Sequence, residues 1–187
     1  SQHCDSAQPQ IAAQDLGVFG CGYNSDMTAD AHQAHLTAAI WNWNVYYHTA
    51  IEAAMTCGGA ENFVNAMGGP AYYGGLAEGF VDVSPLNEAT VAPGTAEAIE
   101  AVRELIVSGE WDVFSGTKLH ITVNDDGTVT VDQEDADLLC DGYEYDTTSG
   151  TLVERDPVIV AAGGASVEDS VITGSMNYFV AGVEDAN

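Results

Sequence analysis

The sequence predicts an α/β fold in which a parallel sheet is flanked by helices, followed by a C-terminal β-hairpin region. A strand, a helix and a second strand are expected within the first 22 residues, which is the order of a right-handed βαβ unit. Residues 36–55 and 95–109 carry apolar side chains at helical spacing. Residues 118–131 show the alternation of a two-stranded hairpin.

The chain is strongly acidic. It holds 29 Asp and Glu against 3 Lys and Arg among 187 residues, a formal net charge of −26. Nucleic acid and anionic membrane surfaces repel such a chain, so we exclude both as partners. The acidic residues are spread along the sequence, which indicates an evenly acidic surface suited to salty surroundings. With 46% hydrophobic residues, the chain can form one domain, or one lobe and part of another.

The sequence predicts no direct insertion into a membrane. It contains no apolar run of about 18 residues, which a membrane-spanning helix needs. It also opens on polar sequence at Ser1, without the pattern of a signal peptide. We therefore expect a mature, processed or truncated product.

The predicted βαβ unit places polar side chains at two strand ends. Residues 1–5 are predicted to end a strand, residues 7–16 to form a helix that Gly17 terminates, and residues 18–22 to form a buried strand. Ligands of parallel sheets collect beyond the carboxyl ends of the strands. Those ends carry His3, Cys4 and Asp5 in the first strand and residues 23–26 after the second.

Residues 36–55 are predicted to form one long helix around which the chain is organised. One face is a buried stripe, made of Leu36, Ile40, Trp43, Tyr47, Ile51 and Ala54. A second face holds Thr37, Trp41, Asn44 and His48. An aromatic ring beside hydrogen-bonding groups is typical of a small-ligand surface, so we expect Trp41 to contact ligand and Trp43 to be core. The alternative is that Trp41 packs under a loop.

The remaining elements are predicted from local signals. Residues 57–75 are rich in glycine and predicted to form a loop, whose tyrosines either line a cleft or pack on the surface. Thr95 suits the N-cap of the helix that ends at Gly109. The hairpin turn Asn124–Gly127 is not a calcium loop, because Thr122 and Gln133 stand at the first and twelfth ligand positions. Further strands are expected at residues 76–83, 158–162 and 178–183, with acidic turns at 133–146.

Four cysteines leave the redox state open. Cys4, Cys21, Cys57 and Cys140 lack the spacing of a zinc site, and three pairings are possible. One or two disulfides in an oxidising compartment are favoured, with free buried thiols as the alternative. Adjacent strands would bring Cys4 close to Cys21.

The sequence makes no case for catalysis. It contains neither a GxSxG nucleophile motif nor a glycine-rich phosphate loop, so we predict a non-enzymatic protein without a cofactor. His32 and His35, with Asp26 and Asp30 nearby, form a conceivable metal cluster. Exposed histidines near a helix start are the more ordinary explanation, and no metal site is predicted.

Several short sequence motifs occur in an order similar to that found in one protein family. These are QHCDS, GCGYNSDM, AHLTAAIWNWNVYY, FVDVSPLN, ELIVSG, VFSGT, NDDGTVTV and MNYFVAGVE. Together they resemble the C-terminal half of the BMP-type basic membrane lipoproteins. These are solute-binding proteins of ABC importers with a two-lobed type I periplasmic-binding fold, and the similar branch is linked to purine nucleosides.

The resemblance implies that residues 1–187 are the C-terminal segment of a two-lobed protein whose N-terminal segment lies elsewhere, in a longer chain or in a second one. It implies an extracellular or periplasmic location, an anchor through a lipidated N-terminus, and a membrane permease as partner. The solute would be a nucleoside-like molecule in the cleft between lobes, held by aromatic stacking and polar contacts. Carried over by position, the ligand-binding candidates are His3, Asp5, Tyr23, Asp26, Trp41 and Trp43.

The chain also departs from this family. Cys4 stands where the family has Thr, and Trp41 stands where many members have Lys. Residues 133–173 are longer than expected and suggest a lineage-specific insertion, with Cys57–Cys140 as a second disulfide. The extra cysteines and the acidity also fit an alternative function, in which an extracellular receptor or structural module reuses the fold without a ligand.

Overall fold

The computed structural model describes residues 6–182, and these divide into two compact units. The first unit extends to Ala96 and the second begins at Glu97, so the boundary falls in the first turn of α4 (Thr95–Ser108). Each unit is described by itself. No helix among the described residues is long and apolar enough to cross a membrane.

The first unit is built on a small mixed sheet with the strand order β1-β2-β3. Helix α1 (Gln8–Asp15) precedes β1 (Gly20–Tyr23), which confirms the helix predicted at residues 7–16. Strand β1 pairs in parallel with β2 (His35–Trp41), and β2 pairs antiparallel with β3 (Val81–Val83). The α/β class is therefore confirmed, but β1–β2 is the one parallel pair in the part of the chain that the structure describes. The strand predicted at residues 1–5 lies outside that part.

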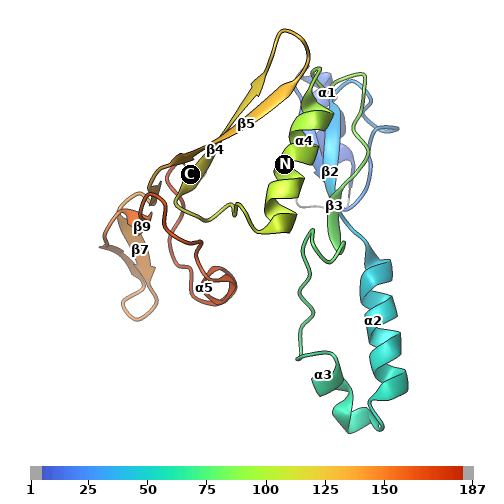
Figure 1. Ribbon diagram of the computed structural model, residues 1–187, viewed down its shortest axis with the longest axis vertical. Coiled ribbons are helices and arrows are strands. Elements are labelled where there is room, and N and C mark those ends of the chain that lie inside the picture. The colour runs from blue at the N-terminus through green and yellow to red at the C-terminus, as the bar shows by residue number, and fades with distance from the viewer. Residues whose placement is uncertain (1–5, 183–187) are drawn as a thin grey trace. The chain divides into compact units, whose positions relative to one another are not determined.

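The long helix predicted over residues 36–55 is wrong in its first third. Residues 36–41 belong to β2, which runs into α2 (Trp43–Thr56), as Figure 1 shows. Asn42 separates the two elements with φ −90° and ψ 81°, outside helical geometry. A short apolar run fits a buried strand as well as a helix, and here pairing with strands on both sides decides in favour of the strand.

The predicted buried stripe is also wrong, because α2 exposes most of it. Trp43 is 48% exposed, Tyr47 56% and Ile51 61%, whereas Ala53 is the buried residue of this helix. Trp43 is therefore not a core residue. The region predicted as a loop at 57–75 contains two short helical segments, η1 (Ala60–Asn62) and α3 (Phe63–Ala66).

The core of the first unit surrounds a buried histidine. His35 is fully buried, and so are the small residues Ala31, Ala34 and Ala38. Its carbonyl oxygen accepts hydrogen bonds from Asn87 Nδ2 (2.9 Å) and from Thr90 Oγ1 (2.6 Å). These bonds fasten the segment after β3 to the start of β2, so the sheet and its following loop form one packed body.

Within its described residues, the second unit contains three strand pairs, helix α5 and all but the first two residues of α4. After α4, which confirms the predicted helix, β4 (Thr117–Val123) and β5 (Val129–Asp135) form the predicted hairpin. Two further pairs follow, β6 (Leu138–Leu139) with β9 (Val158–Val160) and β7 (Tyr143–Asp146) with β8 (Thr151–Glu154). Helix α5 spans Asp169–Gly174.

The structure corrects two predictions made from the sequence of this unit. Residues 133–146 are not mainly turns, because they include the end of β5, all of β6 and β7. The strand predicted at residues 178–183 is reduced, within its described part, to a single antiparallel bridge between Cys140 and Val180. The strand predicted at 158–162 is confirmed over β9.

Gly22→Ala is expected to destabilise the first unit. A β-carbon at Gly22 would lie 3.1 Å from His35 Cε1, 3.2 Å from Met27 Sδ and 3.3 Å from Ala38 Cβ. Such overpacking of a buried site costs about 1–3 kcal/mol of the free energy of unfolding, measurable by urea titration.

Gly75→Ala is the matched control in the same unit. A β-carbon there meets Glu78 Oε2 at 3.4 Å, an ordinary contact with a movable side chain. Its free energy of unfolding should stay within about 0.5 kcal/mol of the parent value. Equal losses in the two variants would contradict the packing described around His35.

Candidate functional site

Aromatic side chains gather where β1 and β2 end. We call this group the aromatic cluster; its members are Tyr23, Trp41, Trp43, Tyr46, Tyr47, Tyr72 and Phe80. They come from the ends of two parallel strands, from the first two turns of α2 and from the segment that leads to β3. Because parallel strands end on the same edge of a sheet, this is the edge at which ligands of α/β sheets are found.

A hydrogen bond joins the two strand ends. The indole Nε1 of Trp41 donates to the hydroxyl oxygen of Tyr23 at 3.2 Å. The parallel register pairs Tyr23 with Ala39, two residues before Trp41, so the side chains leave the sheet close together. The backbone N–H of Asn42 donates to the Phe80 carbonyl at 2.7 Å and fixes the corner between β2 and α2. Trp41 therefore has a set position and ring orientation.

The remaining rings pack in layers around Phe80, which is buried. Its centroid lies 5.3 Å from that of Trp41, 5.6 Å from Trp43 and 5.1 Å from Tyr72. The contacts with Trp43 and Tyr72 are edge-to-face at 85°, a favourable geometry for aromatic pairs. Phe80 forms the base, Trp41 and Tyr23 are half-buried, and Trp43 with Tyr47 is exposed. Rings held in this way present stacking surface to a ligand with little further ordering.

The structure brings together three of the six ligand-binding candidates. Tyr23, Trp41 and Trp43 meet in the aromatic cluster. Asp26 lies instead beside the buried His35, and its carboxylate accepts from the Thr28 backbone N–H at 2.8 Å. His3 and Asp5 lie outside the described residues.

The helical face predicted to carry Trp41, Asn44 and His48 does not exist in that form. Trp41 stands at the end of β2, whereas Asn44 and His48 belong to α2, and His48 is 83% exposed. Sequence reasoning missed Tyr46 and Phe80 as members of the cluster and left Tyr72 open. The sequence signal for these three residues is the concentration of aromatic residues before and after the corner between β2 and α2.

Among residues 6–182, His35 is the one fully buried titratable side chain. Its Nε2 lies 3.4 Å from the Met27 backbone nitrogen and 3.5 Å from Asp26 Oδ1, and its Nδ1 has no hydrogen-bond partner among the described residues. Burial lowers the pKa of His35, and the Asp26 carboxylate opposes this shift in part. The imidazole is therefore neutral at pH 7. Within residues 6–182 there is no group of three His, Cys, Asp or Glu placed to hold a metal ion.

The predicted disulfides are not present among the described cysteines. Cys21, Cys57 and Cys140 are free thiols. Cys57 caps the end of α2, where its Sγ lies 3.2 Å from the Gly59 carbonyl oxygen, and Cys140 is buried in the second unit with its Sγ 3.7 Å from the Asp156 carbonyl oxygen. The thiols of Cys57 and Cys140 thus each have a local acceptor. Cys4, the predicted partner of Cys21, lies outside the described residues.

Comparison with known proteins gives a distant and partial relative. No protein-family profile matches the chain. The chain is 28% identical over 119 residues to the proposed ABC transporter glucose-binding protein TsgA13 of Haloferax volcanii. The match covers 63% of this chain and 28% of that protein, so the chain spans well under two thirds of its relative's length. The similarity reaches solute-binding proteins of ABC transporters in general and no finer group.

The buried His35 predicts a loss of stability in mild acid. Because its pKa in the folded protein is below the ordinary 6.5, the unfolded chain takes up this proton first as the pH falls. The free energy of unfolding should therefore decrease as the pH falls below about 6.5, as measured by urea titration between pH 7 and pH 5. The pKa of Asp26 is lowered from 3.8 by its hydrogen bonds to Thr28, so Asp26 stays charged over this range.

His48→Gln is the matched control, because His48 is exposed on α2. This variant should keep the parent's pH dependence, whereas His35→Gln should reduce it. NMR titration of the parent protein gives an independent value for the pKa of His35. A pKa at or above 6.5 would show that burial does not control this group.

Proposed function

We propose that this chain is part of a solute-binding protein of an ABC importer, working outside the cytoplasm, and that it holds a small ring-shaped solute against the aromatic cluster. The observation that carries the proposal is the hydrogen-bonded pair of Trp41 and Tyr23 at the carboxyl ends of two parallel strands. The distant similarity to TsgA13 supports the class of protein. Binding without catalysis is the activity that both arguments favour.

The aromatic cluster suits a solute with an apolar ring face and polar edges. Trp41 is oriented by its hydrogen bond, while Trp43 and Tyr47 leave about half of their surfaces accessible. A stacked ring buries apolar surface against these side chains. The hydroxyl of Tyr23 and the exposed side chain of Asn24, held at φ 72° at the strand end, supply hydrogen-bonding groups beside the rings.

The proposed solute is a neutral, hydroxyl-bearing ring compound. The resemblance to the BMP-type lipoproteins suggests a nucleoside, and the name of TsgA13 suggests glucose. Both present a ring face for stacking and hydroxyl groups at the edge, and both are uncharged. An anionic solute is disfavoured, because the chain carries a formal net charge of −26 and 3 Lys and Arg in total.

The remaining features of this proposal rest on the resemblance to the BMP-type lipoproteins. Residues 1–187 would be the C-terminal segment of a two-lobed type I periplasmic-binding fold, with the solute in the cleft between lobes. Residues 133–173 would be an insertion, and a membrane permease would receive the solute. His3, Asp5 and Asp26 would add polar contacts to the bound solute or support the residues that make them.

A second candidate function is an extracellular interaction module without a ligand. It is favoured by an apolar stripe on α2, where Trp43, Tyr47, Ile51 and Met55 are four residues apart and 48%, 56%, 61% and 81% exposed. Four apolar side chains along one helix face form a surface that another protein can cover. A stable assembly in mass photometry, with no solute bound, would favour this function.

Isothermal titration calorimetry of the full-length protein tests the proposed function. Glucose, adenosine, guanosine and inosine are titrated separately, and adenosine monophosphate serves as the anionic counterpart of adenosine. We expect saturable binding of at least one neutral solute. If adenosine is that solute, its monophosphate should bind at least about tenfold more weakly, because the phosphate adds about two negative charges that the acidic chain repels.

Trp41→Ala should weaken the binding of that solute by roughly tenfold or more, through the loss of stacking and buried area. Tyr73→Ala is the control, because Tyr73 is 76% exposed and follows directly after a cluster residue. No binding of any neutral solute at millimolar concentration, by protein shown to be folded, would rule out the proposal.

A further inference from the structure

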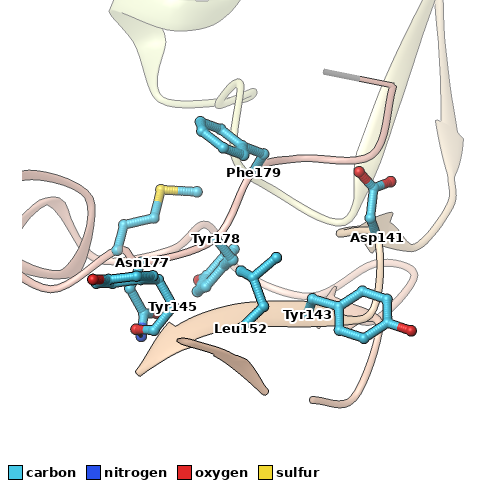
Figure 2. A pocket seen from close by; sticks show the side chains of 8 residues that line it. Asp141, Tyr143, Tyr145, Leu152, Asn177, Tyr178 and Phe179 are labelled. Atoms are coloured by element: carbon cyan, nitrogen blue, oxygen red, sulfur yellow. Dashed lines mark hydrogen bonds between the residues drawn. The ribbon is translucent and has the colours of Figure 1, made fainter. Parts of the chain in front are cut away.

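The second unit contains an open pocket of about 640 Å³, a volume typical of small-molecule sites. Figure 2 shows it between the β7–β8 hairpin and the segment that carries Tyr178 and Phe179. On the hairpin side it is lined by Tyr143, Tyr145 and Leu152. Tyr178 and Phe179 line the other side, so four aromatic side chains line the pocket. None of the four belongs to the aromatic cluster of the first unit.

The register of the hairpin places its three lining side chains on one face. Tyr143 and Tyr145 are two residues apart on β7, and Leu152 on β8 pairs with Tyr145. These side chains are far from covered, with Tyr143 51%, Tyr145 47% and Leu152 68% exposed. An apolar surface of this kind is available to a ligand.

The opposite wall is held in place by backbone hydrogen bonds at both ends. The Tyr145 N–H donates to the Asn177 carbonyl at 2.8 Å, and Asn177 Nδ2 donates to the Tyr145 carbonyl, also at 2.8 Å. Four residues after Asn177, the Ala181 N–H donates to the Leu139 carbonyl at 2.7 Å. Tyr178 and Phe179 lie between these two attachments, so hydrogen bonds on both sides hold this wall of the pocket in place.

The charges at the pocket favour a positive ligand. Asp141 lines it, and no Lys, Arg or His is among its described lining residues. Arg155 does not line it; its guanidinium lies 3.9 Å from the centroid of the Tyr178 ring and 3.7 Å from the Glu144 carboxylate.

We propose that this pocket binds an organic cation that carries a methyl-substituted ammonium group. Such a group attracts the faces of aromatic rings, requires no hydrogen-bond donor from the protein, and gains further from a nearby carboxylate. The ring faces come from Tyr143, Tyr145 and Phe179, because the Arg155 guanidinium already lies over the Tyr178 ring. The carboxylate comes from Asp141. The site lies in the second unit and does not depend on the proposed function of the first.

The test compares choline with its uncharged carbon isostere, 3,3-dimethyl-1-butanol. Both are titrated into the full-length protein at constant ionic strength, and binding is followed by NMR of the tyrosine and phenylalanine ring signals. Potassium chloride at the same concentrations controls for the general attraction of cations to an acidic chain. We expect saturable binding of choline that is about fivefold to tenfold tighter than binding of the isostere.

Two substitutions assign the binding to this pocket. Phe179→Leu keeps an apolar side chain but removes a ring face, and Asp141→Asn removes the charge; each should weaken choline binding about threefold or more.

Two variants outside the pocket are the controls. Tyr73→Leu removes an exposed ring elsewhere, and Trp41→Ala alters the aromatic cluster; both should leave choline binding unchanged. Equal affinity for the isostere, absence of saturation, or choline binding that survives both pocket substitutions would overturn the proposal. None of these outcomes bears on solute binding in the first unit.

Discussion

The parallel pairing of β1 with β2 is the constraint on which the first unit depends. It requires Gly22 to lie against Ala38, with the His35 ring and Met27 beside it, so that there is no room for a larger side chain at Gly22. The same register brings Tyr23 to the end of β1 where Trp41 ends β2. The packing around Gly22 and the candidate binding site at Tyr23 and Trp41 are thus two consequences of one alignment.

The two proposed sites are both built mainly from aromatic side chains. Each gathers aromatic rings from segments separated in sequence, and in each the rings are fixed by hydrogen bonds to neighbouring backbone or side chains. An acidic chain with few cations cannot easily bind anions, so stacking on aromatic faces is the affinity that remains available to it. The first unit combines stacking with hydroxyl and amide groups, and the second combines it with a carboxylate.

Local sequence signals predicted local secondary structure well. They failed where pairing with strands distant in sequence determines whether a segment is a helix or a strand. Helix α4 and the β4–β5 hairpin follow from spacing, the stop at Gly109 and a turn with Gly127 at φ 82°. The same reasoning wrongly extended the helix α2 backwards through β2. The apolar residues from Leu36 to Trp41 fit both the spacing of a helix and that of a strand, and their strand partners are far away in sequence. Tyr23 was predicted from a strand end, and Trp41 from a helical face that the structure does not contain. The pocket at Tyr143 and Phe179 was missed because its lining residues come from segments that are distant in sequence.

The most direct test of the account is the response of the three indole N–H signals in an NMR titration with the solute that binds. The chain has three tryptophans, and Trp111 serves as an internal reference because it lies in the second unit with its Nε1 bonded to the Thr117 carbonyl at 2.8 Å. The signals of Trp41 and Trp43 should shift together and saturate, while that of Trp111 stays in place. A saturable shift of Trp111 with Trp41 unmoved would contradict it.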